Sequence, residues 1–253
     1  MVGILVWKSP QPGKKQKHVT LEARSVLHMR FLSVELLRGP KTPDAVLRRR
    51  VLAAGKRLRK QGVVRVVLPE NFSYWEQLEK SGLRPVSTQA LRRRLAADWV
   101  RFGLAKQGLP AAGAKVAVCG AQLTGELVRT VTELTLRHRY VLLDLPYGGE
   151  DLCRQLRREY GVSLLLGPAK DQLEGAEALV LFDQRTDLSC RNPVVLPLYD
   201  ESAPLPPLIL PPALEEKLPE GADRGQLLAV LQEAGVLKAG QISLAAESWE
   251  CPK

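Results

Sequence analysis

Residues 115–144 read KVAVCGAQLTGELVRTVTELTLRHRYVLLD, and their pattern is the clearest indication of a fold class in the chain. One apolar run at 116–119 stops at Gly120, and a second run at 140–143 stops at Asp144. Between the two runs, leucine and valine recur at spacings of three and four residues, which is typical of an amphipathic helix. The stretch is therefore predicted to form a strand, a tight turn, a helix and a second, parallel strand.

The alternation of apolar runs and connecting segments continues toward the C-terminus. Three further apolar runs, each short enough to form one strand, lie at residues 162–166, 178–182 and 194–198. Strands that alternate with helices or loops in this way predict an α/β fold with a parallel sheet. We therefore expect a Rossmann-like, mostly parallel and doubly wound sheet in the C-terminal half.

The half that precedes this sheet is expected to form a smaller, basic α/β unit. Its apolar patterns favour strands at 2–7 and 63–68, and helices at 42–61, 71–80 and 88–107. Residues 18–38 follow neither the helical nor the strand period clearly, and the length of that stretch favours a helix.

Glycine and proline mark the expected boundary and the C-terminal extension. GLPAAG at 108–113 predicts a division into domains at 1–110 and 111–253. Residues 202–212, SAPLPPLILPP, contain five prolines and are incompatible with a helix, although an edge strand is expected at their end. A final helix is expected at 223–234, followed by a frayed tail in which Trp249 is a candidate to dock.

The turn after the first strand of the C-terminal half partly matches the dinucleotide-binding fingerprint. That fingerprint has three glycines before the helix and an acidic residue about 20 positions later. Gly120 and Gly125 occupy the first and last glycine positions, and Asp144 ends the second strand. Gln122 replaces the middle glycine, where a side chain obstructs a pyrophosphate, so the motif is degenerate. The N–H groups of a helix start still attract phosphate, and Gln122 or Thr124 would add a side-chain donor.

The carboxyl ends of the predicted strands form the expected ligand-binding edge, as in other open α/β sheets. This edge carries the turn at 120–125 together with Asp144, Asp183 and Arg185. The two aspartates suit ligand hydroxyl groups, and the arginine suits a carboxylate or a phosphate. The alternative interpretation is that these are ordinary polar strand ends. We expect a small anionic, nucleotide-like ligand here, and an NAD(P)-like nucleotide is the cofactor to consider.

The order of the predicted parts resembles that of two-domain dehydrogenases. Both have an α/β N-terminal part, a long connecting helix and then a Rossmann-type part, and the resemblance covers most of the chain. It implies a nucleotide cofactor. Because the middle glycine of the fingerprint is missing and no Lys–Asp or His–Asp pair stands out, the expected protein is a degenerate, non-catalytic relative. Whether it is an enzyme stays open.

Charge is distributed unevenly and suggests a second function. Residues 1–114 contain 23 Lys+Arg and 7 Asp+Glu, whereas residues 115–253 contain 14 and 20. A basic half predicts an anionic partner, and nucleic acid is the alternative ligand. The residues expected to contact it are Arg48, Arg49, Arg50, Lys56, Arg57, Arg59, Lys60, Arg92, Arg93 and Arg94. The alternative interpretation is that these runs are ordinary solvated helix faces.

The sequence lacks the motifs that are typical of several function classes. The sequence contains no run of 18 apolar residues and no Gly-x-Ser-x-Gly, His-Glu-x-x-His or P-loop pattern, so neither a membrane partner nor those chemistries are expected. Cys119, Cys153, Cys190 and Cys251 form no Cys-x-x-Cys pair, which argues against a metal site or disulfide framework and favours a cytoplasmic location. His138 is predicted to be a solvated helix end. A third possibility is a protein-interaction module that uses the proline-rich segment and the acidic half.

Overall fold

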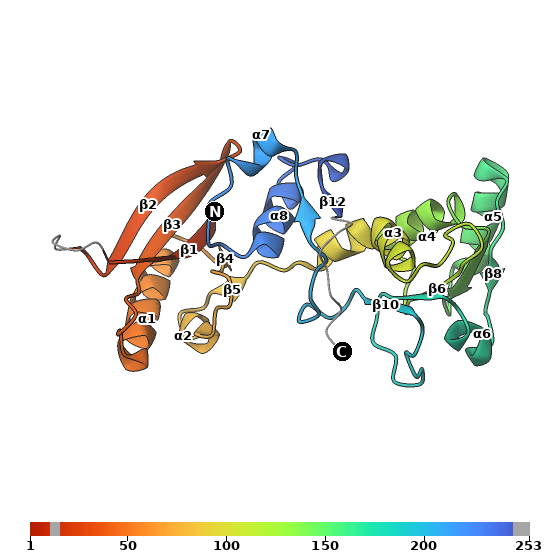
Figure 1. Ribbon diagram of the computed structural model, residues 1–253, viewed down its shortest axis with the longest axis horizontal. Coiled ribbons are helices and arrows are strands. Elements are labelled where there is room, and N and C mark those ends of the chain that lie inside the picture. The colour runs from red at the N-terminus through yellow and green to blue at the C-terminus, as the bar shows by residue number, and fades with distance from the viewer. Residues whose placement is uncertain (11–15, 245–253) are drawn as a thin grey trace. The chain divides into compact units, whose positions relative to one another are not determined.

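The computed structural model describes residues 1–10 and 16–244, so the expectations for the tail that contains Cys251 and Trp249 lie outside the described residues. The chain divides into two compact units (Figure 1). Unit 1 comprises Met1–Thr88 and Leu210–Gln241, and unit 2 comprises Gln89–Ile209 and the residues from Ile242 onward. The boundary placed at 110/111 from the sequence falls inside unit 2, because the long helix before it belongs to that unit.

Unit 1 is built on a mixed sheet with the strand order β2-β3-β1-β4-β5. Its strands are β1 Val2–Lys8, β2 Val19–Val26, β3 Met29–Leu37, β4 Arg65–Val67 and β5 Arg84–Pro85. Its helices are α1 Asp44–Lys60, α2 Trp75–Glu79, α7 Pro212–Glu215 and α8 Arg224–Glu233, followed by a 3₁₀ turn at Ala239–Gln241. All neighbouring strands are parallel except β2, which runs antiparallel to β3.

Helices cover both faces of the unit 1 sheet. One face places Leu5 and Val34 against Leu58 of α1 in a buried cluster. Arg65 points away from that cluster and donates hydrogen bonds of 2.9 and 2.7 Å to the carboxylate of Glu233 in α8. Because α1 and α8 lie on opposite faces (Figure 1), the C-terminal segment completes the unit that the N-terminus begins.

The helix predicted for residues 18–38 is wrong, because β2 and β3 form a hairpin there. The two residues of its turn, Leu27 and His28, have φ values of 47° and 70°, as in the tight turns that match strand twist. In β3, Val34 packs on the α1 face while Phe31 is buried on the other face. A strand that is buried on both faces loses the strict alternation that identifies half-exposed strands in a sequence.

Unit 2 contains an all-parallel sheet with the order β10-β9-β6-β7-β8. Its strands are β6 Lys115–Cys119, β7 Tyr140–Asp144, β8 Leu165–Leu166, β9 Ala178–Leu181 and β10 Val194–Pro197. When these strands are counted along the chain, the order is 3-2-1-4-5, which is the Rossmann arrangement. The predicted Rossmann-like parallel sheet is therefore confirmed. A separate antiparallel pair joins β11 Leu208–Ile209 to β12 Ser243–Leu244.

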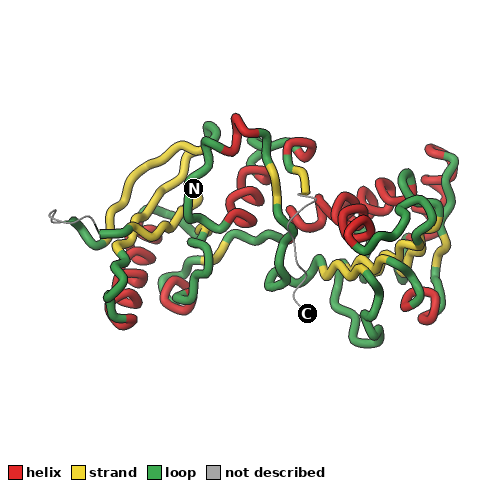
Figure 2. The backbone as a smooth tube through the Cα atoms, in the orientation of Figure 1, coloured by secondary structure: helices red, strands yellow, loops and turns green. Residues whose placement is uncertain are grey.

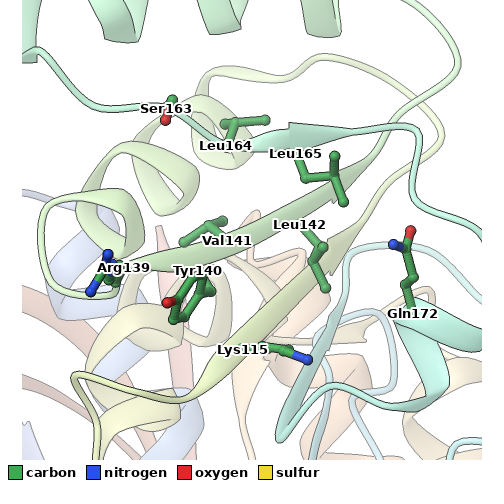
Figure 3. Close-up of a pocket in the computed structure, with 9 residues that line it drawn as sticks. All are labelled: Lys115, Arg139, Tyr140, Val141, Leu142, Ser163, Leu164, Leu165 and Gln172. Atoms are coloured by element: carbon green, nitrogen blue, oxygen red, sulfur yellow. The ribbon is translucent and has the colours of Figure 1, made fainter.

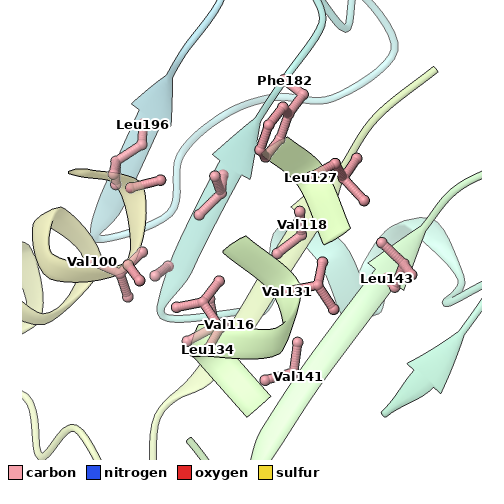
Figure 4. Close-up of a cluster of buried hydrophobic side chains, with 14 of the residues drawn as sticks. Val100, Val116, Val118, Leu127, Val131, Leu134, Val141, Leu143, Phe182 and Leu196 are labelled. Carbon is pink, nitrogen blue, oxygen red and sulfur yellow. The ribbon is translucent and has the colours of Figure 1, made fainter. Parts of the chain in front are cut away.

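Helices cover one face of the unit 2 sheet more completely than the other. α3 Gln89–Lys106, α4 Gly125–Thr135 and α5 Gly149–Tyr160 cover the first face. Figure 4 shows the contacts there, with Val100 of α3 and Leu127 and Val131 of α4 facing the valines and leucines of the strands. Among the described residues, the second face is covered by the short helix α6 Lys170–Glu174 and by the loop between β9 and β10, which contains no helix (Figure 2). We refer to it as the thinly covered face.

Candidate functional site

Three strands of unit 2 end in register at one edge of the sheet. Cys119, the last residue of β6, pairs with Asp144 of β7 and with Leu181 of β9. Gly120 N donates to Asp144 O at 3.1 Å, and Phe182 N donates to Cys119 O at 2.9 Å. Strand order reverses between β6 and β9, so this edge is the topological switch point at which open α/β sheets bind ligands. We refer to it as the carboxyl rim, and it carries Gly120, Asp144 and Asp183.

The start of α4 presents backbone donors at this rim. Thr124 is the N-cap, and its Oγ1 accepts a hydrogen bond of 3.2 Å from Leu127 N, so its hydroxyl oxygen is already engaged. Within the described part of the chain, the N–H groups of Gly125 and Glu126 have no acceptor. Gly125 is exposed, and apart from its chain neighbours and the backbone of its own helix no heavy atom of the described residues lies within 4 Å of the position that a Cβ would occupy. Unsatisfied N–H groups at a helix start attract anions.

Gly120 has a packing role in addition to its place in the motif. A Cβ at this position would lie 2.4 Å from Cδ1 of Leu127, a side chain that is fully buried between α4 and the sheet. The glycine therefore allows α4 to approach the end of β6 closely. The next residue, Ala121, donates its N–H to Asp183 Oδ2 at 2.7 Å, so the carboxylate of Asp183 holds the turn against the end of β9. Gln122 follows and is exposed.

Arg185 joins two carboxylates across the rim. Its Nε and Nη2 each donate to Asp187 at 2.8 Å, and its Nη1 donates to Asp144 Oδ2. These hydrogen bonds, of which those donated to Asp187 have the largest effect, raise the pKa of Arg185, and the guanidinium lowers the pKa of Asp187 to about 2. Asp187 was not among the expected site residues, although a carboxylate two positions after an arginine in a polar loop is a visible signal. The positive charge of Arg185 is thus compensated by the two carboxylates.

A thiol lies beneath this network without taking part in it. Cys119 is fully buried at the end of β6. Burial, followed by the negative charge of Asp144, raises the pKa of its thiol to about 12. A thiol with such a pKa is almost entirely protonated at neutral pH and is a poor nucleophile.

A second arginine reaches the rim from a helix that the sequence does not connect with it. Arg93 of α3 donates from Nη1 to Glu126 Oε2 at 2.8 Å, and its guanidinium lies 5.6 Å from the centre of the Phe182 ring. Its Nε is buried and has no hydrogen-bond partner among the residues that the structure describes. The sequence places Arg93 in a basic run for nucleic acid, whereas the structure places it beside the first turn of α4.

The basic runs are divided between the two units: those at 48–50 and 56–60 lie in unit 1, and that at 92–94 lies in unit 2. Arg50 and Arg57 in α1 donate to the carbonyl oxygens of Leu37 and Val19, and so help to hold the hairpin. Arg92 in α3 is only 2% exposed and donates to carbonyl oxygens near residue 201, so its expected availability to nucleic acid is wrong. By sequence, unit 1 contains 21 Lys+Arg and 11 Asp+Glu, and unit 2 contains 16 of each. The net positive charge of the chain therefore lies entirely in unit 1.

His138 is not the solvated helix end that was expected. Its side chain is 4% exposed, and Nδ1 lies 2.7 Å from Ala111 O. Burial lowers the pKa of His138, and the nearby charge of Arg137 acts in the same direction. The imidazole therefore joins the segment before β6 to the end of α4 as a neutral, largely buried group.

The described ranges contain neither a membrane-spanning helix nor a metal-binding group of side chains. Within residues 1–10 and 16–244, no helix is both long and apolar enough to cross a membrane. The same ranges contain no group of three or more His, Cys, Asp or Glu side chains arranged to hold a metal ion.

Comparison with known proteins gives no family. No family model and no curated protein matches the sequence. Among solved structures, the chain is similar to one of the subunits of dipicolinate synthase from Bacillus halodurans, with 14% identity over 68% of this chain and 66% of that chain and a TM-score of 0.34. It is also similar to D-lactate dehydrogenase from Escherichia coli, with 12% identity, 60% and 58% coverage and a TM-score of 0.32. A third similar structure is L-tryptophan dehydrogenase from Nostoc punctiforme, with 14% identity, 59% and 44% coverage and a TM-score of 0.26.

The matched part of the chain spans 58% of the D-lactate dehydrogenase and 44% of the L-tryptophan dehydrogenase. Because identities and TM-scores are low throughout, the assignment of unit 2 to a Rossmann-like fold rests on its strand order and parallel pairing.

Proposed function

We propose that unit 2 binds a small anionic, nucleotide-like ligand at the carboxyl rim. One observation supports this proposal above the others. At the switch point between β6 and β9 lie two backbone N–H groups, those of Gly125 and Glu126, that have no acceptor in the described residues. A backbone N–H group that gives up its hydrogen bond to water needs another acceptor, and an anion at a helix start supplies that acceptor.

The proposed ligand places one phosphate group at the start of α4. Gln122 is exposed beside this point and would donate its side-chain amide. Asp144 accepts from Arg185 through Oδ2, and within the described residues its Oδ1 accepts no side-chain hydrogen bond, so Oδ1 would accept a ribose hydroxyl. Because Asp183 already holds the Ala121 N–H, a second phosphate placed on the turn would meet a carboxylate. These contacts favour a mononucleotide-like ligand over an extended NAD(P)-like dinucleotide, and no catalytic step is assigned to the site.

The test is titration calorimetry with AMP and with NAD⁺, supported by native mass spectrometry of the freshly purified chain. Gly125→Asp adds a carboxylate where the phosphate would lie, and the open space around Gly125 allows the variant to fold. We expect AMP to bind the natural protein and the variant to lose binding by about a hundredfold, since one charge-assisted hydrogen-bond site is replaced by like-charge repulsion. Unchanged AMP affinity in the variant would exclude the rim.

Gly113→Asp is the matched control. Gly113 also has no heavy atom within 4 Å of its Cβ position, and it precedes the opposite end of β6. The control adds the same charge to the same unit, so a loss of AMP binding in both variants would indicate a general charge effect and would contradict the proposed position.

A second candidate function is nucleic-acid binding by unit 1, and the concentration of charge on α1 favours it. Arg49, Lys56 and Lys60 are exposed. They are separated by seven and four residues, so they fall on one line along the helix. Within the described residues, none of the three forms an ion pair, whereas Arg48 is paired with Asp44. We refer to these three residues as the α1 stripe.

The stripe is tested by measuring the affinity for a fluorescent 20-nucleotide single-stranded DNA at several salt concentrations. Replacing all three residues by glutamate should reduce the slope of log K against log salt by about 2, since each phosphate contact on a single strand contributes about 0.7. The matched control makes the same replacement at three arginines of α5 in unit 2, which are Arg154, Arg157 and Arg158. Equal losses in the two triple variants, or a natural protein without salt dependence, would exclude the stripe.

A further inference from the structure

We propose that a groove at the opposite edge of the unit 2 sheet binds a second kind of ligand, a small anion with a flat apolar body such as an aromatic carboxylate. The groove has a volume of about 580 Å³ and lies at the amino ends of β6 and β7, next to β8 (Figure 3). The carboxyl rim is formed by the other ends of the same strands, so the two sites are distinct.

Apolar side chains of the thinly covered face form the floor of the groove. Leu142 and Tyr140 lie on the face of β7 that is opposite α4, and Leu165 of β8 lies beside them. α6 packs Leu173 against this face, but the helix has only five residues. Tyr140 and Leu165 consequently remain 46% exposed, although both are large and apolar. Adjacent exposed apolar groups that line a cavity are typical of a binding site.

The polar groups of the groove are cationic or hydrogen-bond donors. The Lys115 ammonium and the Arg139 guanidinium form no ion pair with any carboxylate in the described part of the chain, and no Asp or Glu lines the groove. Glu177 accepts the backbone N–H of Lys115 at 2.6 Å, not a hydrogen bond from its ammonium. Gln172 accepts the Ala169 N–H through Oε1 at 2.9 Å, so its NH₂ group remains to donate.

The positions of these groups define the ligand. In Figure 3, Lys115 and Gln172 lie beside Leu142, and Arg139 lies at the other end of the groove beside Tyr140. A carboxylate between the ammonium and the amide would leave its apolar body on Leu142 and Leu165. The Arg139 guanidinium already lies 5.4 Å from the centre of the Tyr140 ring, which builds a flat cationic surface suited to stacking. The volume is in the range of small-molecule sites.

Charge complementarity selects this occupant over a purely apolar one. An apolar peptide would bury the two cations without compensating them, and burying an unpaired charge is costly. A small anion compensates the charge and covers the apolar floor together. Both requirements are met by one aromatic carboxylate.

The probe is 2-naphthoate, compared with its neutral analogue 2-naphthamide, and binding to the full chain is measured by calorimetry. We expect 2-naphthoate to bind at least about tenfold more tightly than the amide, since a charge-assisted hydrogen bond is replaced by a neutral one. Lys115→Gln should remove this preference, and Leu165→Glu should abolish binding of 2-naphthoate. Lys41→Gln is the matched control, because Lys41 is an exposed lysine of unit 1, and it should bind 2-naphthoate like the natural protein.

Three results would overturn the proposal. The first is equal affinity for 2-naphthoate and 2-naphthamide, or no binding of either, in the natural protein. The second is unchanged 2-naphthoate affinity in Lys115→Gln. The third is a dimer, detected by sedimentation, that dissociates in Leu165→Glu, since that result would identify a second copy as the occupant. Gly125→Asp should leave 2-naphthoate binding unchanged, so failure at the rim and failure at the groove are distinguishable.

Discussion

Unit 1 and unit 2 are both α/β structures, but they differ in how their strands run and in where their charges lie. Every strand of the unit 2 sheet is parallel, so all strand ends of one kind meet at one edge. In unit 1 the antiparallel strand β2 interrupts this arrangement. Polar groups such as Asp144 and Asp183 consequently gather at the rim of unit 2, whereas the cations of unit 1 lie along a helix. The direction of the strands therefore explains why the polar strand ends of unit 2 meet at a single edge.

The separate cores of the two units give the largest expected effect. Leu58 and Leu127 are fully buried, each in the hydrophobic cluster of its own unit. Leu58→Ala and Leu127→Ala should each reduce the free energy of unfolding of that unit by about 2–5 kcal/mol, because each leaves a cavity. Amide hydrogen exchange measured by mass spectrometry should show the loss of protection only in the unit that carries the substitution. Loss of protection across both units in either variant would show that the two units unfold together.

The two glycines of the β6–α4 turn should respond differently to alanine. Gly120→Ala forces a Cβ against the buried Leu127 and should cost about 1–3 kcal/mol, as expected for overpacking. Gly125→Ala meets no atom, and alanine restricts the unfolded chain, so the protein should be stabilised by about 0.4–1 kcal/mol. Urea denaturation of the two variants measures the difference. If both substitutions are neutral, α4 does not depend on the close approach at Gly120.

The β2-β3 hairpin of unit 1 contains a turn whose stability a substitution should increase. His28 has a φ of 70°, a left-handed conformation that costs a residue with a side chain about 1–2 kcal/mol. His28→Gly should therefore stabilise unit 1 by about 1 kcal/mol, which thermal unfolding can detect. Leu27 has a φ of 47° but is also buried, so Leu27→Gly should lose more by removing its side chain than it gains. Destabilisation by His28→Gly would show that this turn is not strained.

The smallest expected effect concerns pH and the buried His138 of unit 2. Because the pKa of His138 is lowered in the folded state, the unfolded chain binds a proton first as pH falls. The contribution of His138 to stability should therefore decrease below a pH of about 6.5, the unperturbed value, and stay constant above it. His138→Gln keeps a donor for Ala111 O and should flatten this decrease. Urea denaturation at several pH values provides the measurement, and an equally steep decrease in the variant would assign it to other groups.

Local sequence patterns were enough to predict most elements of unit 2 and much of the order of elements in unit 1. Parallel strands that are buried on both faces have nearly continuous apolar runs, and the helices between them have a helical period, so residues 115–144 identify a βαβ unit without other information. Helix α8 begins at Arg224 with Asp223 as its cap, close to the predicted 223–234, because a cap acts on its immediate neighbours. The hairpin β2-β3 was missed because its burial depends on helices on both faces.

Which side chains meet at the carboxyl rim and in the groove became visible only in the folded chain. Arg93 is separated from Glu126 by 33 residues, and no local pattern connects α3 with the first turn of α4. The same is true of Arg185 and Asp144, which are 41 residues apart, and of the burial of His138 beside Ala111. The groove at the other edge depends on which strand face the short helix α6 leaves open. Local periodicity encodes which residues turn inward, but contacts between distant segments arise only when the sheet has been assembled.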